Sequence, residues 1–220
     1  MSAPLLLSFE VALAATVVAG VLGIALAALL ASRRLPASDF VEAVLTAPMV
    51  LPPTVLGYYL LVSVGRRSAL GEAFELLTGG PLVFTKGALV LAASLSALPF
   101  VVKTARAAME DVDKRLTAAA STLGASPIRV FFEIVLPQSQ RGIFAGLTLG
   151  FARALGDFGV TLMVAGNIPG ETQTAALAIY DAVQAGRDSE AAGLAALMTA
   201  LAIAALYLGQ KLVRGTSHGW

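Results

Sequence analysis

The sequence LLLSFEVALAATVVAGVLGIALAALLA occupies residues 5–31 and is followed directly by Ser32, Arg33 and Arg34. A helix needs roughly 20 apolar residues to cross the hydrocarbon core of a bilayer, and this stretch is longer. No lysine or arginine precedes Arg33, so the stretch lacks the basic segment with which a signal peptide begins. We therefore predict a membrane span that is retained in the protein.

The composition of the whole chain is that of an integral membrane protein. Of its 220 residues, 57% are hydrophobic and 13% are charged. An ordinary soluble domain carries roughly 25% charged residues. So few charges could not cover this much apolar surface in water, and lipid must be part of the solvent. The net charge of +1 leaves no basic face for a nucleic-acid partner.

Two residue types limit the chemistry that the chain can perform. It has no cysteine, which excludes disulfides, thiolate chemistry and cysteine-based metal sites. Its only histidine, His218, lies in the polar C-terminal tail, where a lone histidine is expected to be inert. No metal site is expected.

Four further apolar stretches are long enough to cross the membrane, at residues 40–64, 87–108, 142–166 and 191–212. Glycine and alanine recur in them, and such small side chains let helices approach closely where lipid offers no hydrophobic drive. We predict an all-α, polytopic transmembrane helical bundle of about five spans, forming one domain over residues 1–220.

Lysines and arginines in the short loops predict the orientation of this bundle. With the N-terminus outside, the inner side collects ten of them: Arg33, Arg34, Lys103, Arg106, Lys114, Arg115, Arg129, Arg141, Lys211 and Arg214. The outer side keeps four: Arg66, Arg67, Lys86 and Arg187. We expect a multi-pass protein of the cytoplasmic (inner) membrane with its N-terminus outside and its C-terminus inside.

The connection at residues 110–140 is expected to face the cytoplasm. One helical face of its first half is made of Leu116, Ala119, Ala120 and Leu123. Gly124 suits the position after a helix end, and Ser126 and Pro127 suit the start of a second helix. Pro137 is expected to end that apolar helix. The helix either lies on the membrane surface or docks against a partner protein.

The spacing in this connection resembles the EAA loop of ABC importer permeases. That family's pattern is Glu-Ala-Ala, three residues, glycine, nine residues and Ile-x-Leu-Pro. The matching residues here are Ala119, Ala120, Gly124, Ile134, Leu136 and Pro137. Ala118 stands at the position of the family's acid. The resemblance implies the fold of a type I importer permease, with two ATPase subunits docked on residues 116–137.

Other segments resemble the molybdate permeases within that family. They are LPPTVLGYYLL at residues 51–61, Gly65-Arg66-Arg67, FARALGDFG at 151–159 and NIPGET at 167–172. Sulfate and thiosulfate permeases share a looser version, and tungstate permeases are close. The resemblance implies ATP-driven uptake of molybdate or tungstate, with sulfate or thiosulfate as the alternative. It also implies an external (periplasmic) oxyanion-binding protein, and we expect a second copy of the chain, with the path at their interface.

Two groups of residues inside the spans are candidates for the anion path. Arg153 and Asp157 lie four residues apart on one helical face, and each would cost about 2.5–3.5 kcal/mol at the bilayer centre. They form either an ion pair that locks the packing or part of the path wall. Pro52 and Pro53, which Thr54 follows, are expected to kink the second span. The kink either lies beside the anion path or only fits the helix into the bundle.

The connection at residues 167–190 is expected outside. Its first residues have turn chemistry: Asn167, Pro169, Gly170 and Thr172. Thr174 is a candidate N-cap and Gly186 a candidate stop for a helix between them. Either this is a simple surface turn, or, as the resemblance implies, it helps to form an outer gate and a platform for the binding protein.

The chain is predicted to be a transporter subunit and not an enzyme. It has no Gly-x-x-x-x-Gly-Lys-Ser/Thr sequence, so ATP and Mg²⁺ are assigned to the partner ATPase and no cofactor to this chain. Moving a dianion inward against 100 mV costs roughly 4.6 kcal/mol, which demands such a drive. An ion-coupled secondary transporter should show repeats and more intramembrane acids than Asp157, and a membrane enzyme should show a metal or nucleophile cluster.

Overall fold

The computed structural model describes residues 2–32 and 37–215, with side chains up to residue 211. Arg33, Arg34 and His218, together with the side chain of Arg214, lie outside this description. Every regular element within the described residues is a helix, which confirms the all-α fold class. In chain order they are α1 (Ser2–Ala31), α2 (Ser38–Thr46), η1 (Ala47–Met49), α3 (Pro53–Val64), α4 (Ala69–Thr78), α5 (Lys86–Glu110), α6 (Lys114–Thr122), α7 (Pro127–Val130), the π-helical η2 (Phe131–Val135), α8 (Leu136–Leu155), α9 (Gly159–Ala165), α10 (Ala175–Gln184) and α11 (Asp188–Gly215).

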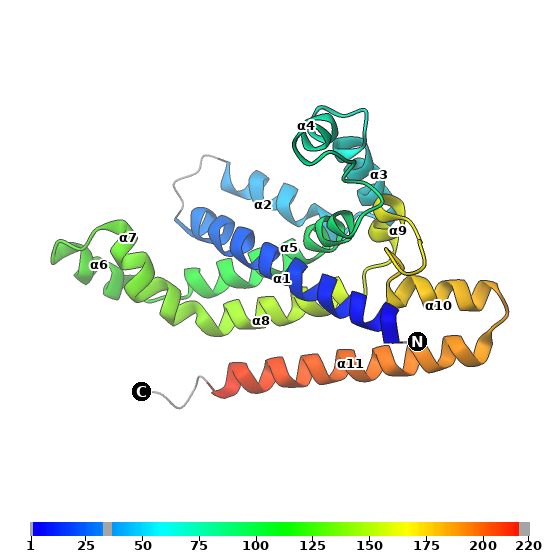
Figure 1. Cartoon of the computed structure of the whole chain (residues 1–220). Coiled ribbons are helices and arrows are strands. Elements are labelled where there is room, and N and C mark those ends of the chain that lie inside the picture. The colour runs from blue at the N-terminus through cyan, green and yellow to red at the C-terminus, as the bar shows by residue number, and fades with distance from the viewer. Residues whose placement is uncertain (1, 33–36, 216–220) are drawn as a thin grey trace.

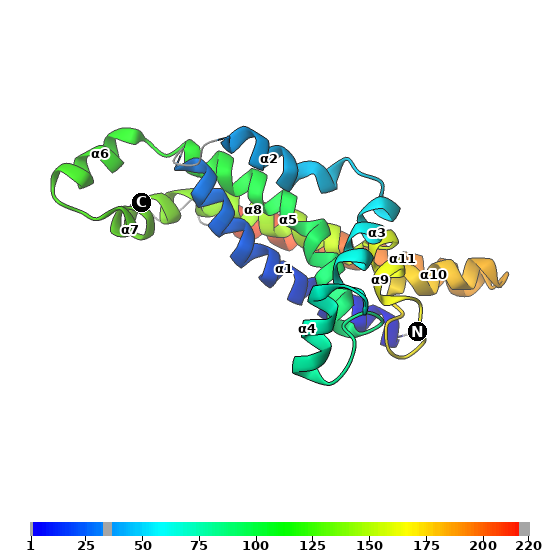
Figure 2. The ribbon, with the colours of Figure 1, turned by 90° about the horizontal axis from the view of Figure 1, so that it is seen from above.

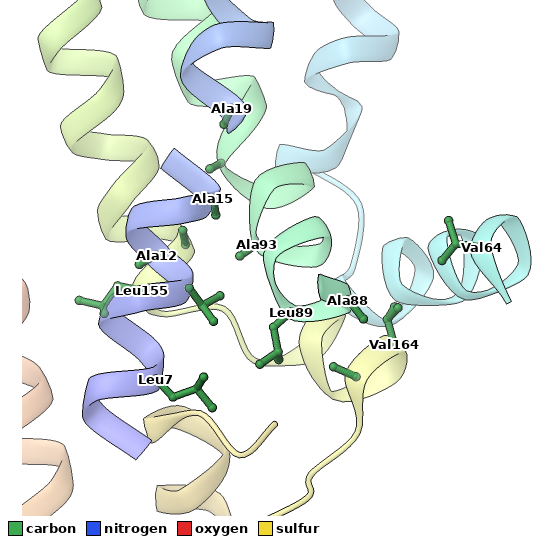
Figure 3. Close-up of a cluster of buried hydrophobic side chains, with 14 of the residues drawn as sticks. Leu7, Ala12, Ala15, Ala19, Val64, Ala88, Leu89, Ala93, Leu155 and Val164 are labelled. Carbon is green, nitrogen blue, oxygen red and sulfur yellow. The ribbon is translucent and has the colours of Figure 1, made fainter. Parts of the chain in front are cut away.

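Helices α1, α5 and α8 pack side by side as the centre of the bundle (Figure 1). Small buried side chains let them approach closely. Figure 3 shows Ala12, Ala15 and Ala19 of α1 on the side that meets Leu89 and Ala93 of α5. Alanine faces of this kind replace the large apolar residues of a water-soluble core, because lipid provides no hydrophobic drive between helices.

Glycines of α8 bring that helix into contact with the backbone of α5. A Cβ at Gly142 would lie 2.3 Å from the Cβ of Ala108. A Cβ at Gly146 would lie 2.0 Å from Oγ1 of Thr104 and 3.2 Å from the Cα of Val101. These positions tolerate no side chain at the observed helix separation.

Three described helices, α1, α5 and α11, are long and apolar enough to cross a membrane, and the number is five when each of two bent helix pairs is counted as one span. The five correspond to the five apolar stretches of the sequence. Helix α11 packs along α8 and α10 and leaves most of its surface exposed, as expected for a helix that faces lipid (Figure 1).

The second stretch, residues 40–64, bends far more sharply than the expected kink. Helix α2 with η1 and helix α3 meet at a break of residues 50–52, and their directions differ by 110°. The break follows from the two prolines. Pro53 takes the first position of α3, where its missing N–H costs no hydrogen bond, and Pro52 stands before it in extended conformation.

The predicted boundaries of the fourth stretch, a helix ending at Pro137 and a span beginning at Gly142, are wrong. One helix runs from Pro127 to Leu155, and the break comes later, before α9, with a bend of 60°. The turn η2 lets Pro137 stay inside the helix, because the N–H of Leu136 bonds back to the carbonyl of Phe131. This wider π turn accommodates a proline that would collide with the preceding turn of an α-helix.

The contact between α5 and α8 gives a direct test. Gly146→Ala should destabilise the protein by about 1–3 kcal/mol, because the new Cβ meets Thr104 and the backbone of Val101. Gly80→Ala is the matched control, since nothing lies within 4 Å of the added carbon there. The melting temperature of the purified protein should fall for the first variant alone; equal melting of both would contradict the packing described.

Candidate functional site

Residues 114–135 form a segment that projects beyond one end of the bundle (Figures 1 and 2). We call it the α6–η2 segment. None of the residues of its three helices is buried. Leu123 is 88% exposed, and Ile128 and Phe132 are also exposed. This amount of apolar surface outside the bundle indicates that another molecule covers it.

Gly124 ends α6 as predicted. Its φ is +84°, a left-handed conformation that favours glycine. The N–H of Gly124 donates to the carbonyl of Ser121 at 3.1 Å, and the N–H of Ala125 donates to that of Ala120 at 3.0 Å. These two bonds are the Schellman arrangement, which satisfies the last carbonyls of the helix.

The following helix also starts as predicted. The N–H of Arg129 donates to Oγ of Ser126 at 3.3 Å, and Pro127 occupies the first helical position. A hollow of about 780 Å³ separates the α6–η2 segment from the ends of α1 and α5. Of the family-pattern residues, Leu136 packs against the bundle, while Pro137 is exposed.

The remaining residues predicted for ATPase coupling lie along the projecting segment. Exposed members are Leu116, Ala119, Leu123 and Gly124, and partly buried members are Ala120 and Ile134. The structure therefore collects them in one accessible segment, and Leu136 joins that segment to the core.

Asp157 lies at the break between α8 and α9 and is 1% exposed. Its Oδ1 accepts from Oγ of Ser96 at 2.9 Å and from Nη1 of Arg153 at 3.0 Å. Its Oδ2 accepts from the N–H of Thr161 at 3.1 Å. One carboxylate thus joins α5, α8 and α9 and satisfies a backbone donor that the break leaves free.

Arg153 is the more accessible member of the pair, with 29% of its side chain exposed. Its bond to Asp157 uses one of the guanidinium nitrogens. An arginine has five N–H donors, so further donors can face an anion while the pair is kept. The geometry assigns Asp157 a structural role and is compatible with both roles for Arg153.

The two helix breaks lie next to each other. A Cβ at Gly159, the first residue of α9, would lie 2.6 Å from the Cβ of Pro53, the first residue of α3. A Cβ at Gly57 would lie 2.7 Å from Met163, one turn further along both helices. The structure therefore brings Pro52, Pro53 and Thr54, all exposed, to the end of α9 at which Asp157 lies.

The connection after α9 is a compact turn. The carbonyl of Ile168 accepts from the N–H groups of Glu171, Thr172 and Gln173, and Oγ1 of Thr172 accepts from the N–H of Ile168 at 3.1 Å. Thr172 is fully buried, so its side chain braces the turn and does not face a path. The exposed residues of the turn are Ile168, Pro169, Gly170 and Glu171, and Asn167 is partly buried.

The start of α10 is held by a residue that the sequence did not single out. Thr174 occupies the predicted N-cap position, but its side chain makes no capping bond. The N–H of Ala175 donates instead to Oγ of Ser8 in α1, at 2.8 Å. Serines are common in spans, and only the tertiary structure singles out Ser8 and Ser96. Gly186, with φ +67°, follows the end of α10 as predicted.

Broken spans in the membrane core, as at residues 50–52 and 156–158, are typical of membrane transport proteins. The family model for the binding-protein-dependent transport system inner membrane component matches residues 19–214, and the chain belongs to this family. It is accordingly a permease subunit in the inner membrane, not an enzyme, and the ATPase of such an importer is a separate chain. These findings confirm the predicted class of protein and its location in the inner membrane, and the orientation of the bundle stays a prediction.

Over most of its length the chain is similar to permeases named for molybdenum transport. The chain is 43% identical over 210 residues to the molybdenum transport system permease protein ModB of Escherichia coli, covering 95% of this chain and 92% of that protein. It is 40% identical over 214 residues to ModB of Azotobacter vinelandii, covering 96% and 95%. The inward-facing MetNI methionine ABC transporter shares the fold, with a TM-score of 0.77 at 16% identity over 98% of this chain and 95% of that chain.

The Asp157 site predicts a graded effect of substitution. Asp157→Leu should destabilise by about 3–5 kcal/mol, because it leaves the charge of Arg153 uncompensated in the bundle. Asp157→Asn keeps an acceptor and should lose less. Adding Arg153→Met to Asp157→Leu should restore only part of the loss, because Ser96 and the N–H of Thr161 still lack their acceptor.

The measurement is the melting temperature of each purified variant. Glu133→Gln serves as the control, because its pair with Arg129 is exposed on both sides and contributes little. Full recovery in the double variant would contradict the capping role and would leave Asp157 as a simple ion-pair partner.

Proposed function

We propose that this chain is the permease of an importer that takes up molybdate or tungstate. The observation that carries the proposal is the identity of 43% and 40%, over nearly the whole chain, to proteins named for molybdenum transport. Two copies of the chain would form the path, two ATPase subunits would drive it, and an external oxyanion-binding protein would deliver the anion.

The paired helix breaks support a path in this region. Backbone groups freed by a break inside a bilayer must be satisfied by protein or by water in a cavity, since lipid offers no partner. Pro52 and Thr54 are exposed in the single chain, next to the break at Asp157. Packing against a second copy around a two-fold axis would shield this exposed surface from lipid and enclose a path.

Arg153 is the candidate residue for binding the anion within this path. It stands in the last turn of α8, one turn before the second break, with part of its guanidinium accessible. A dianion leaving water needs a compensating positive charge. Asp157 fixes the side chain through one nitrogen, so that the rest of the guanidinium remains available.

The α6–η2 segment is the proposed docking site of the ATPase. Its apolar residues are exposed, and the segment extends beyond the ends of α1, α5 and α8 (Figure 2). A helix that lay on the membrane surface would be expected to lie across the bundle end. This geometry favours docking over the membrane-surface alternative.

Transport itself tests the proposed function. The purified chain, reconstituted in liposomes with its ATPase and binding protein, should take up molybdate only with ATP, and tungstate should compete. Sulfate uptake without molybdate uptake would support the sulfate alternative. Uptake driven by an ion gradient without ATP would indicate a secondary transporter instead.

The role of Arg153 can be measured in the same system. Arg153→Gln should lower molybdate uptake per folded protein at least about tenfold, equivalent to about 1.4 kcal/mol, if the guanidinium binds the anion. Arg66→Gln, which removes an exposed arginine at the other end of α3, should leave uptake unchanged. Full uptake by a folded Arg153→Gln variant would restrict Arg153 to packing.

The proposed orientation places the α6–η2 segment in the cytoplasm and the turn at residues 167–172 outside. It is supported by the excess of lysine and arginine at the inner ends of the spans. Cysteines introduced at Ser126 and at Gly170, both exposed, should react with an impermeant thiol reagent from opposite sides of the membrane. Reaction of both from the outside would reverse this conclusion.

A further inference from the structure

Helix α2 is held to the bundle by few contacts. It has no buried residue, and Phe40 and Val44 are exposed. In the described part of the chain, its polar link to another helix is the ion pair between Glu42 and Arg106 of α5. Because α2 is one arm of the span that turns by 110° at residues 50–52, its position also sets the geometry of that break.

Arg106 holds a second carboxylate at the same time. Its Nε donates to Oε1 of Glu110 at 2.9 Å, while Nη1 donates to Glu42. The arginine side chain is only 13% exposed. A planar guanidinium can hold two carboxylates in fixed directions, which a lysine cannot do. Lys103 lines a small hollow together with Glu42, Arg106 and Glu110, and it brings a second positive charge to this group.

Glu110 lies at the junction with the α6–η2 segment. It is the last residue of α5, and only residues 111–113 separate it from α6. Glu110 and Lys114 also line the 780 Å³ hollow between the segment and α1. Helix α6, the part of the segment next to α5, has no buried residue, so a force on α6 acts on the end of α5 and on Glu110.

We propose that Arg106 is a positioning residue that links the α6–η2 segment to α2. A displacement of the segment shifts Glu110, Arg106 follows its partner, and Glu42 moves α2 and with it the break at residues 50–52. This inference rests on the proposed function, because it requires the ATPase to act on the segment.

The test removes the link and leaves both ends in place. Glu42→Gln should keep ATPase binding and ATP hydrolysis near the level of the unaltered protein, while molybdate taken up per ATP falls at least about tenfold. The KM for molybdate should not change, since no path residue is altered. The matched control is Glu75→Gln, which removes the exposed Arg66–Glu75 pair and should leave coupling intact. Normal coupling in Glu42→Gln would overturn the proposal.

A charge exchange separates the link from general stability. Glu42→Arg combined with Arg106→Glu exchanges the charges of the pair and places a guanidinium on α2 opposite the end of α5. Arg106→Glu alone should lose the coupling between ATP hydrolysis and uptake. The double variant should recover at least half of the coupling that Arg106→Glu loses. If the exchange gives no recovery although the double variant is folded, a direct electrostatic link is contradicted.

A distance measurement keeps this test independent of the cargo. Spin labels at Val44→Cys on α2 and Val21→Cys on α1, both exposed positions in a cysteine-free chain, report the position of α2. With the ATPase bound, adding ATP should change the distance between the two labels in the otherwise unaltered protein. The same addition should leave this distance unchanged in the Glu42→Gln variant. An equal change in both overturns the link. Failure of molybdate uptake alone, with this distance change intact, would count against the proposed cargo and leave the link standing.

Discussion

The need to satisfy every backbone hydrogen bond inside a membrane shapes this molecule more than any other constraint. A broken span exposes donors and acceptors for which lipid offers no partner. At the second break, the carboxylate of Asp157 accepts the N–H of Thr161 and fixes α9 to α5 and α8. At the first break, the N–H groups of Val50 and Leu51 both turn back to the carbonyl of Ala47. These local hydrogen bonds make the two breaks tolerable inside a membrane.

Helix α5 connects the two regions to which we assign function. Near its middle, Ser96 donates to Asp157 and so supports the paired breaks. At its end, Arg106 and Glu110 lie between α2 and the α6–η2 segment. A helix packed against α1 and α8 along much of its length can carry a small displacement from one region to the other.

Local patterns in the sequence predicted what depends on local interactions. The apolar stretches gave the spans, and Gly124 ended α6 because a left-handed residue at a helix end is a property of a few neighbouring residues. The predicted helix end at Pro137 was wrong, because a π turn accommodates this proline within a helix and no sequence pattern indicated that turn. The role of Ser8 and the burial of Thr172 were not predicted, since the bond of Ser8 to α10 spans 167 residues and the burial of Thr172 depends on the packed loop.

In the proposed function the paired breaks line the anion path, and the accessibility of Thr54 tests this most directly. Thr54→Cys, in a chain without natural cysteine, places a thiol at the exposed start of α3. In liposomes with ATPase and binding protein, a charged impermeant reagent should reach this thiol from one side of the membrane without ATP. It should reach the thiol from the other side when ATP is trapped on the ATPase. Molybdate should slow the reaction. A thiol that reacts from neither side would contradict the account.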